Sequence, residues 1–406
     1  MFMKNLARLL QYTAHSTGIT TKTYYNSITH LSILLIDIAS FSSLDSFLLL
    51  PHHFHMWKAF KDDSALTDRQ MDLILSRYDQ VKDLPLHKEL VGESIHLIER
   101  QDNRALFVLF DQGFKTLGPL YPLVLIFTLF PTVSALYERL GITESVRKAT
   151  LSDIAIWVKT YEKQNQGITG LDRYGWVCRH LCAKVLSLGR LQFEQGFFRF
   201  PYSIYFDTKR KLYRTFAQGG LMCGSGGYIG VEDGETDSWT TTYSISDAFL
   251  SAHEVDQEKG CISREAVSVL LSDLKSISSP EKPAILVHIP EGGPLTPSLV
   301  DASFALAQAM FSPTLFVCDS WLLDPELAKV LPSESNICRF MRRFKKFPVS
   351  FSTPQIYERV FTFGATRTDV LTWTSTTSLQ KRVQDHICRG GIFRTMGGYV
   401  PLPNDL

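Results

Sequence analysis

Cysteine is scarce in this chain, with seven residues among 406. An odd number scattered over such a length does not form the dense framework of a disulfide-stabilised secreted domain. Cys178 and Cys182 have the spacing of neighbours on one helix face, but no second pair or nearby histidine completes a zinc site. We therefore expect free thiols in a reducing, cytoplasmic compartment, and no bound metal.

Net charge is nearly absent as well, because 42 lysines and arginines balance 41 aspartates and glutamates to leave +1. A chain without an excess of one sign has no global field that attracts nucleic acid or an anionic membrane surface. Any anion must then be bound by local groups. The expected partner is a small-molecule substrate, with no nucleic acid and no membrane.

Long uninterrupted hydrophobic runs are missing too. The most apolar stretch, residues 117–133, is broken by three prolines and is shorter than the ~20 residues of a membrane-spanning helix. Near the N-terminus, Gln11 and His15 interrupt the apolar core that a secretory signal requires. The apolar stretch is therefore expected in a folded interior.

The composition that remains is that of a globular protein, 45% hydrophobic and 20% charged, over a length that suits two domains. In the first part, Thr67 and Gln70 have the spacing of a helix capping box, and Thr132 is expected to begin a further helix. The polar stretch 141–150 is the best boundary. We predict a helical domain over residues 1–149 and a second domain over residues 150–406.

The second domain combines helices with strands. Amphipathic helices are expected over residues 154–161 and 177–188, and later helices begin at Ser263, Thr296, Ser335 and Ser378. Strands are expected at residues 190–200, 203–216, 284–289, 314–323, 359–364 and 369–373. The predicted class is therefore α+β, with a helical N-terminal domain followed by a mixed-sheet domain.

A short turn joins the strand 284–289 to the helix that begins after Thr296. The run His288-Ile289-Pro290-Glu291-Gly292-Gly293-Pro294-Leu295 is followed by Thr296-Pro297, a helix cap and a first helical proline. Unpaired amides at a helix start, together with its dipole, form an anion site. The turn either wraps a phosphate or pyrophosphate or is a tight connection in which the glycines only turn the chain.

Three runs carry a resemblance to a known family. They are Leu188-Gly189-Arg190-Leu191-Gln192-Phe193-Glu194, the run from His288 to Leu295, and Cys318-Asp319-Ser320-Trp321-Leu322-Leu323-Asp324-Pro325 followed by Ser335-Asn336-Ile337. With these runs the chain resembles a bacterial two-domain GNAT-like N-acyltransferase family over about residues 152–398. The order of strands and helices is also that of the acyl-CoA-binding half of GNAT enzymes.

The resemblance implies a function and a set of site residues. The expected activity is transfer of an acyl group from acyl-CoA, the co-substrate, to an amine, with the donor lying between the strands 284–289 and 314–323. The cofactor-binding residues are then Gly292, Gly293, Leu295, Thr296 and Asn336.

Acyl transfer to an amine requires a base and an acid for the leaving thiolate. The candidate base is His288 at a strand end, with Glu291 holding or replacing it, and Asp319 is a second candidate. Ser320 completes the catalytic candidates, although the Gly-x-Ser-x-Gly pattern of a hydrolase nucleophile is absent around it. Trp321 and Asp324 are the candidate substrate-binding residues.

A second hypothesis comes from the turn itself. GNAT enzymes carry a Gln/Arg-x-x-Gly-x-Gly/Ala loop at this place, whereas this chain has Pro290-Glu291-Gly292-Gly293-Pro294. The prolines remove amide donors and Glu291 repels phosphate. The alternative is a non-catalytic or divergent protein of the same fold that binds a carboxylate, sugar or phosphate at the Gly292-Gly293 turn. The oligomeric state stays open, a dimer included.

Overall fold

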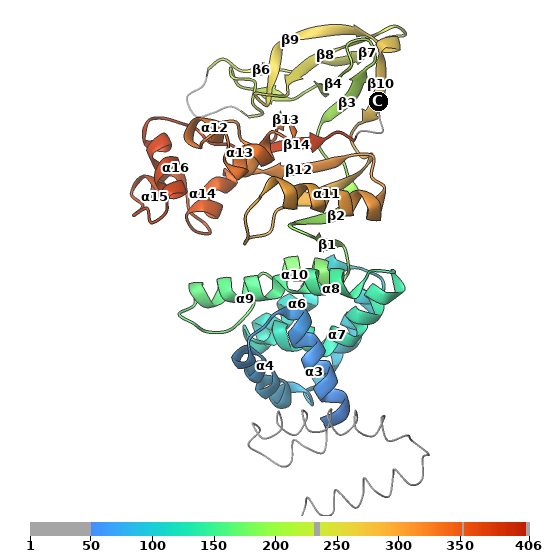
Figure 1. Ribbon diagram of the computed structural model, residues 1–406, viewed down its shortest axis with the longest axis vertical. Helices are drawn as coiled ribbons and strands as arrows, with labels where there is room; N and C mark the ends of the chain where they lie inside the picture. The colour runs from blue at the N-terminus through green and yellow to red at the C-terminus, as the bar shows by residue number, and fades with distance from the viewer. Residues whose placement is uncertain (1–49, 231–235, 351–352, 403–406) are drawn as a thin grey trace, which may run out of the picture. The chain divides into compact units, whose positions relative to one another are not determined.

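The structure is a computed structural model that describes residues 50–230, 236–350 and 353–402 (Figure 1). The chain divides into two compact units, residues 1–59 and residues 60–406. Residues 1–49 of the predicted helical domain lie outside the described residues.

The first part of the described chain is helical, as expected. Its helices are α3 (Leu50–Ser64), α4 (Asp68–Val81), α5 (Pro85–Glu99), α6 (Asn103–Leu117), α7 (Tyr121–Arg139), α8 (Glu144–Leu151), α9 (Asp153–Gln164) and α10 (Tyr174–Leu181). The capping box of Thr67 and Gln70 is confirmed at the start of α4. The helix expected to begin at Thr132 begins at Tyr121 instead, because Pro122 fits its first turn and Pro131 is accommodated inside it.

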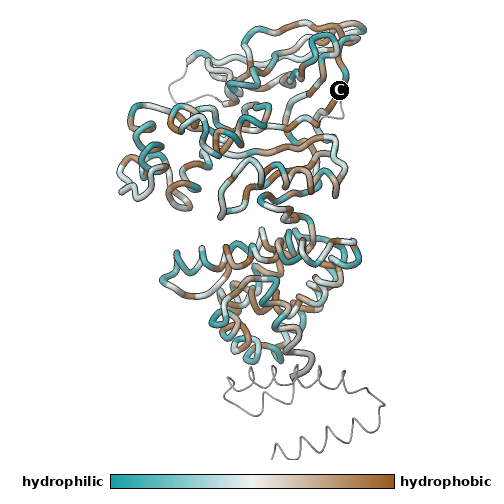
Figure 2. The backbone as a smooth tube through the Cα atoms, viewed as in Figure 1, coloured by the Kyte–Doolittle hydropathy of each residue, from teal (hydrophilic) through white to brown (hydrophobic). Residues whose placement is uncertain are grey.

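Helix α7 holds the most apolar stretch of the sequence. By length and hydropathy it could cross a membrane, but 67% of its most apolar window is buried inside the protein. Tyr121, Leu123, Val124, Leu125 and Leu129 are fully buried. In Figure 2, hydrophobic and hydrophilic stretches alternate along the described chain. The stretch is a core helix, which confirms the expected interior position.

A six-stranded sheet, here called the main sheet, organises the second part. Its order is β1 (Val185–Leu188), β2 (Leu191–Phe197), β11 (Pro283–His288), β12 (Phe316–Ser320), β14 (Met396–Val400) and β13 (Lys345–Pro348). Only β11 and β12 pair in parallel, and the other neighbours in this sheet are antiparallel. The class predicted from the sequence, helices followed by a mixed sheet, is confirmed.

A second, antiparallel sheet follows β2 in the chain. It contains β10 (Leu274–Ser278), β3 (Tyr202–Asp207), β4 (Leu212–Ala217), β8 (Phe249–Asp256) and β7 (Tyr243–Ile245), with β9 (Cys261–Leu270) paired to β8. A separate pair is β5 (Met222–Cys223) with β6 (Trp239–Thr240). The helix expected from Ser263 was wrong. The segment forms a strand because it pairs with β8 and contains the β-branched residues Ile262, Val267 and Val269.

The later helices are α11 (Pro297–Phe311), α12 (Leu327–Val330), α13 (Asn336–Met341), α14 (Gln355–Val360), α15 (Arg367–Leu371) and α16 (Ser378–Cys388). The helix starts expected at Thr296, Ser335 and Ser378 are confirmed. The strands expected at 359–364 and 369–373 were wrong. A capping box of Thr366 and Asp369 begins α15 there, and short apolar runs do not by themselves separate strand from helix.

The helix expected over residues 177–188 was wrong in its second half. Helix α10 ends at Leu181, Ala183 takes a left-handed backbone conformation with φ of 51°, and Val185–Leu188 pairs with β2.

The two faces of the main sheet pack against different hydrophobic clusters. Phe193, Ile285 and Phe316 share one buried cluster with residues of α11. Side chains of the opposite face, including Val317, contribute to a cluster with β3.

Candidate functional site

Strands β11 and β12 separate at their C-terminal ends. Their parallel pairing covers only Ile285 with Phe316 and Leu286 with Val317. Beyond these residues, His288 pairs with β2, and Asp319 pairs with β14. The sheet therefore opens between the two strands at the edge where open α/β sheets place ligands.

The predicted bases lie on the two strands that border this opening. His288 and Asp319 follow the paired residues Leu286 and Val317 by two positions each, so both project from the same face of the sheet. Their environments differ. Asp319 accepts a hydrogen bond from Arg199 at 2.7 Å, which ties its carboxylate into an ion pair.

The turn after β11 keeps backbone donors free. Gly292 has a φ of 106°, a conformation that glycine adopts without strain. The N–H groups of Glu291, Gly292, Gly293 and Leu295 donate to no acceptor within the described residues. Since α11 begins directly after this turn, its helix dipole adds to the attraction for an anion.

The remaining predicted cofactor residues surround the start of the two helices. Leu295 is buried in the cluster beneath α11, and the Thr296 side chain makes no capping hydrogen bond. Asn336 is the first residue of α13, half-buried, with Ser335 as the cap that accepts from the Cys338 N–H. Thr296 and Asn336 thus keep polar groups available, whereas Leu295 contributes packing.

His288 lies in a charged cluster that joins β11, β2 and α10. Its Nε2 lies 3.1 Å from Oε2 of Glu194, and Arg179 donates to Glu194 at 2.6 Å. The Trp176 ring contacts His288 edge to face, with centroids 5.0 Å apart. The carboxylate that holds His288 is therefore Glu194, while Glu291 is exposed and has no hydrogen bond or ion pair within the described residues.

The electrostatics of this cluster favour an ionised Glu194. Burial by itself would raise the pKa of the Glu194 carboxyl, but the hydrogen bond with His288 and the charge of Arg179 outweigh it, so the pKa lies below its ordinary value. An ionised carboxylate accepts the Nε2 proton of His288. Nδ1 of His288, which has no hydrogen-bond partner among the described residues, then carries the free lone pair.

A small cavity of about 200 Å³ adjoins the turn. Its lining includes Pro290 to Gly293, Arg190, Ser187, Gln192 and Asp153. Ser187, Gln192 and His288 are register partners across β1, β2 and β11, so they form one polar row on the same face of the sheet. The cavity thus continues from the turn along the polar face of β1 and β2.

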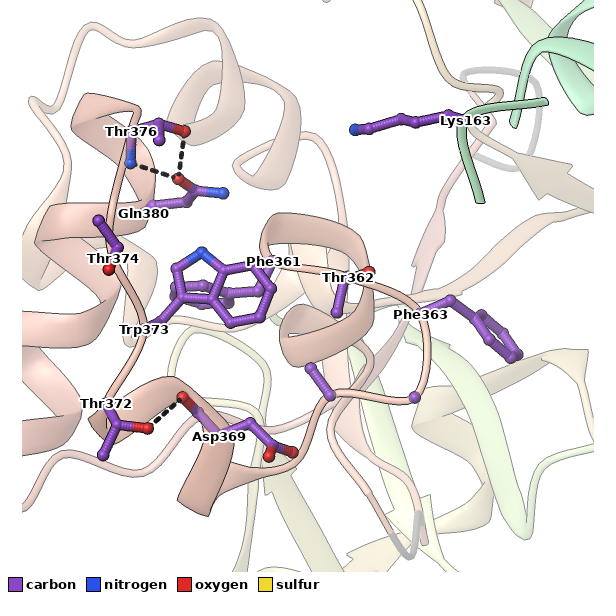
Figure 3. A pocket seen from close by; sticks show the side chains of 12 residues that line it. Lys163, Phe361, Thr362, Phe363, Asp369, Thr372, Trp373, Thr374, Thr376 and Gln380 are labelled. Atoms are coloured by element: carbon purple, nitrogen blue, oxygen red, sulfur yellow. Dashed lines mark hydrogen bonds between the residues drawn. The ribbon is translucent and has the colours of Figure 1, made fainter. Parts of the chain in front are cut away.

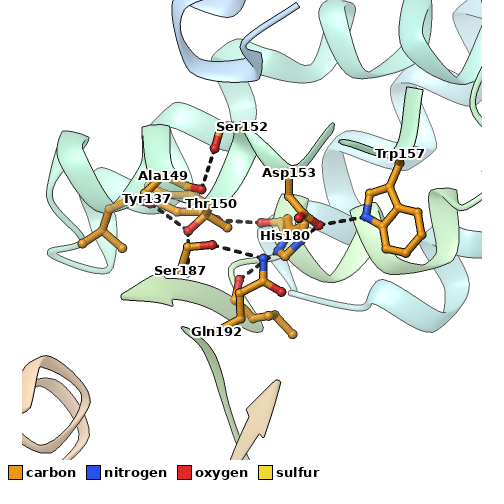
Figure 4. Close-up of polar contacts among 11 residues, drawn as sticks. Tyr137, Ala149, Thr150, Ser152, Asp153, Trp157, His180, Ser187 and Gln192 are labelled. Atoms are coloured by element: carbon orange, nitrogen blue, oxygen red, sulfur yellow. Dashed lines mark hydrogen bonds and ion pairs between the residues drawn. The ribbon is translucent and has the colours of Figure 1, made fainter. Parts of the chain in front are cut away.

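A buried hydrogen-bond network lies behind this cavity (Figure 4). Asp153 Oδ2 accepts from the indole N–H of Trp157 at 2.8 Å and lies 3.0 Å from Nε2 of His180. The other ring nitrogen of His180 faces the carbonyl of Val185 at 3.1 Å. Both ring nitrogens of His180 therefore face acceptors, Oδ2 of Asp153 and the carbonyl of Val185. The network ties α9 and α10 to β1.

The other predicted residues on β12 and after it have structural partners. The Ser320 hydroxyl is buried and accepts from the N–H of Leu322, which makes it the cap of the 3-10 turn Trp321–Leu323. Trp321 packs between two hydrophobic clusters. Asp324 accepts from the N–H groups of Glu326 and Arg394. These hydrogen bonds hold the loop together, and burial raises the pKa of the Asp324 carboxyl to about 7.

A larger hollow of about 730 Å³ lies elsewhere, on α14 to α16 (Figure 3). Phe361 and Trp373 meet edge to face there, and Lys163 of α9 completes the lining. None of the residues predicted for the site lines it. Within the described residues, no group of three or more His, Cys, Asp or Glu side chains could hold a metal ion.

Sequence reasoning missed Glu194 and Arg190 as parts of the site. Both stand in the run Leu188 to Glu194 that carried the family resemblance, but no role was predicted for them. The alternation of β2 could have signalled Glu194, since Gln192 and Glu194 lie on one face of the strand and the apolar Leu191 and Phe193 lie on the other. The pairing partner of β2, which decides what these residues contact, depends on long-range topology.

Two family models match adjoining parts of the chain. A GNAT-like C-terminal domain matches residues 185–400, and an N-acyltransferase N-terminal domain matches residues 58–183. The junction of these matches lies after α10, whereas the polar stretch of the sequence predicts a boundary between residues 149 and 150. No curated protein matches the sequence significantly.

Solved structures of similar fold are acyltransferases. A mutant acyltransferase in complex with octanoyl-CoA is 18% identical, with a TM-score of 0.53 over 84% of this chain and 86% of that chain. An acyltransferase in complex with decanoyl-CoA and teicoplanin is 19% identical, with a TM-score of 0.50 over the same 84% and 86%. At such identity the likeness establishes the fold.

Proposed function

Because the chain belongs to the family with a GNAT-like C-terminal domain, joined here to an N-acyltransferase N-terminal domain, we propose that it transfers an acyl group from acyl-CoA to an amine. The observation that carries the proposal is the opening between β11 and β12, with unpaired N–H groups on the turn that follows β11. Those donors and the start of α11 would hold the pyrophosphate of the donor.

The acyl thioester would then lie in the opening, between His288 and Asp319. We assign the base to His288, because Glu194 fixes its Nε2 and leaves Nδ1 free, whereas Arg199 pairs with Asp319. The amine nitrogen attacks the thioester carbonyl, a C–N bond forms and the C–S bond breaks. Nδ1 of His288 takes the proton from the amine and passes it to the departing thiolate.

The acceptor is proposed to be a small-molecule amine, in keeping with the teicoplanin complex of a similar acyltransferase. The cavity beside the turn, lined by Asp153, Ser187 and Gln192, offers a polar approach to the row that ends at His288. The cytoplasm is the proposed compartment, since all seven cysteines are free.

The proposal is tested by adding acetyl-, octanoyl- or decanoyl-CoA and measuring the melting temperature. A ligand that binds only the folded state raises the melting temperature. At a ligand concentration a hundredfold above Kd, the free energy of unfolding increases by ~2.7 kcal/mol. Release of free CoA thiol with a panel of primary amines then measures transfer. No melting shift with any acyl-CoA, but a shift with phosphate, a sugar or a carboxylate, would favour the ligand-binding alternative that Pro290, Glu291 and Pro294 suggest.

A further inference from the structure

One arginine contacts the turn after β11 from the β1–β2 hairpin. The guanidinium of Arg190 donates to the carbonyls of Gly293 at 3.1 Å, Pro290 at 3.0 Å and Gly292 at 2.8 Å. Its planar fork of N–H donors suits several acceptors at once. Three of the four carbonyls from Pro290 to Gly293 are thereby held by a single side chain.

The backbone of Arg190 is itself fixed. Its N–H donates to the hydroxyl of Ser303, a fully buried residue of α11, at 2.8 Å. Gly189, which precedes it, has a φ of 70°, and a side chain at that position would meet the Ser303 hydroxyl at 2.8 Å. The hairpin is thus docked on α11, and its arginine reaches back to the turn from which α11 starts.

The orientation of the carbonyls decides the orientation of the N–H groups. In a trans peptide the C=O of one residue and the N–H of the next point in opposite directions. The carbonyl of Pro290 shares its peptide with the N–H of Glu291, and the carbonyl of Gly292 shares its peptide with the N–H of Gly293. Contact with Arg190 therefore turns these two N–H groups to the opposite side, where no acceptor among the described residues meets them.

We propose that Arg190 is a positioning residue that organises the turn into a phosphate cradle by holding its carbonyls and so presenting the N–H groups of Glu291 and Gly293. The proposal rests on the proposed use of acyl-CoA. The positive charge of Arg190 also offsets the Glu291 carboxylate beside the cradle. Two amide donors held in place make up for those that Pro290 and Pro294 lack.

A purely structural role for Arg190 would affect ligands with and without phosphate alike, whereas a role in positioning the cradle would affect only ligands with phosphate. Probes of both kinds therefore separate the two roles. CoA carries the pyrophosphate, whereas octanoyl-pantetheine keeps a thioester but has no phosphate. Dissociation constants of both probes are measured by calorimetry for the wild type, Arg190→Ala and Arg190→Lys. We expect Arg190→Ala to weaken CoA binding roughly tenfold or more, the worth of one charge-assisted hydrogen bond, and to leave octanoyl-pantetheine within about twofold.

Controls make each outcome decisive. Arg190→Lys, which keeps the charge but loses the fork, should recover part of the CoA affinity. Arg264→Ala, which removes an exposed arginine paired with Asp237 in the second sheet, should change neither constant. Where Arg190→Ala does not fold, Arg190→Lys carries the same comparison of probes.

Equal weakening of both probes, or no weakening of either, would overturn the role of Arg190 while the proposed function stands. A wild type that binds neither CoA nor any acyl-CoA would overturn the proposed function, and this inference with it.

Discussion

Replacing Glu194 by glutamine tests whether the contact with His288 supports catalysis. The change keeps the volume of the side chain but removes the charge that Nε2 of His288 and Arg179 share, at 3.1 and 2.6 Å. A hydrogen bond to a charged group contributes ~1.5–3 kcal/mol. If that contribution is realised when His288 becomes protonated, kcat falls about 10- to 150-fold.

The assay is steady-state release of CoA thiol from octanoyl-CoA with the best amine found. Because Glu194 touches the base and not the turn, we expect the loss in kcat with the KM for octanoyl-CoA within about threefold. His288→Ala should lose more, in the range of ~100- to 10,000-fold that general bases provide. Glu258→Gln, at a surface glutamate whose side chain is 79% exposed, serves as the matched control and should stay within about twofold. An unchanged kcat in Glu194→Gln would refute the support that Glu194 gives to His288, and an unchanged kcat in His288→Ala would refute the assignment of His288 as the base.

Other substitutions test the fold and the turn. Arg147→Met should lower the free energy of unfolding by ~3–5 kcal/mol in a urea titration, because it leaves the buried Asp63 without its ion-pair partner at 2.6 Å. The control Arg264→Ala, at an exposed ion pair, should lower it by no more than about 1 kcal/mol. Equal losses in the two variants would contradict the reasoning. Asp324 has a folded-state pKa raised to about 7, above its unfolded value, so its stabilising proton is lost as pH rises through about 7. The melting temperature should fall as the pH rises from about 4 to about 7 and should change little above that. Asp324→Asn should flatten this fall, whatever its effect on the melting temperature itself. Gly293→Val should leave the melting temperature within a few degrees, since a Cβ there would lie 3.7 Å from the Arg190 side chain. It should weaken CoA binding at least about tenfold by covering the turn. An unchanged Kd for CoA would show that the turn only connects β11 to α11.

The sequence predicted the parts of the site that depend on local signals. The strand 284–289, the Gly292-Gly293 turn and the helix start at Thr296-Pro297 depend on proline and glycine acting on their own neighbours. The structure has all three, although the Thr296 hydroxyl makes no capping hydrogen bond. Local signals did not predict the secondary structure where pairing with a distant strand determines it. Residues 261–270 carry a helical apolar spacing but form a strand against β8, because β-branched residues accept either environment until a partner strand is present.

Charged residues of the site were harder to predict for the same reason. Glu291 lies three residues from His288 in the sequence, yet Glu194, far away in the chain, supplies the carboxylate. Antiparallel pairing of β2 with β11 brings them together, and no spacing in one sequence encodes that register. Arg190 reaches the turn through the same pairing.

A crystal structure with bound CoA tests the central claim most directly. The account predicts the pantetheine arm between β11 and β12 and a pyrophosphate oxygen at ~2.7–3.2 Å from the N–H groups of Glu291 and Gly293, with Arg190 still on the carbonyls behind them. CoA bound away from this opening, or a pyrophosphate that makes no contact with the turn, would contradict it.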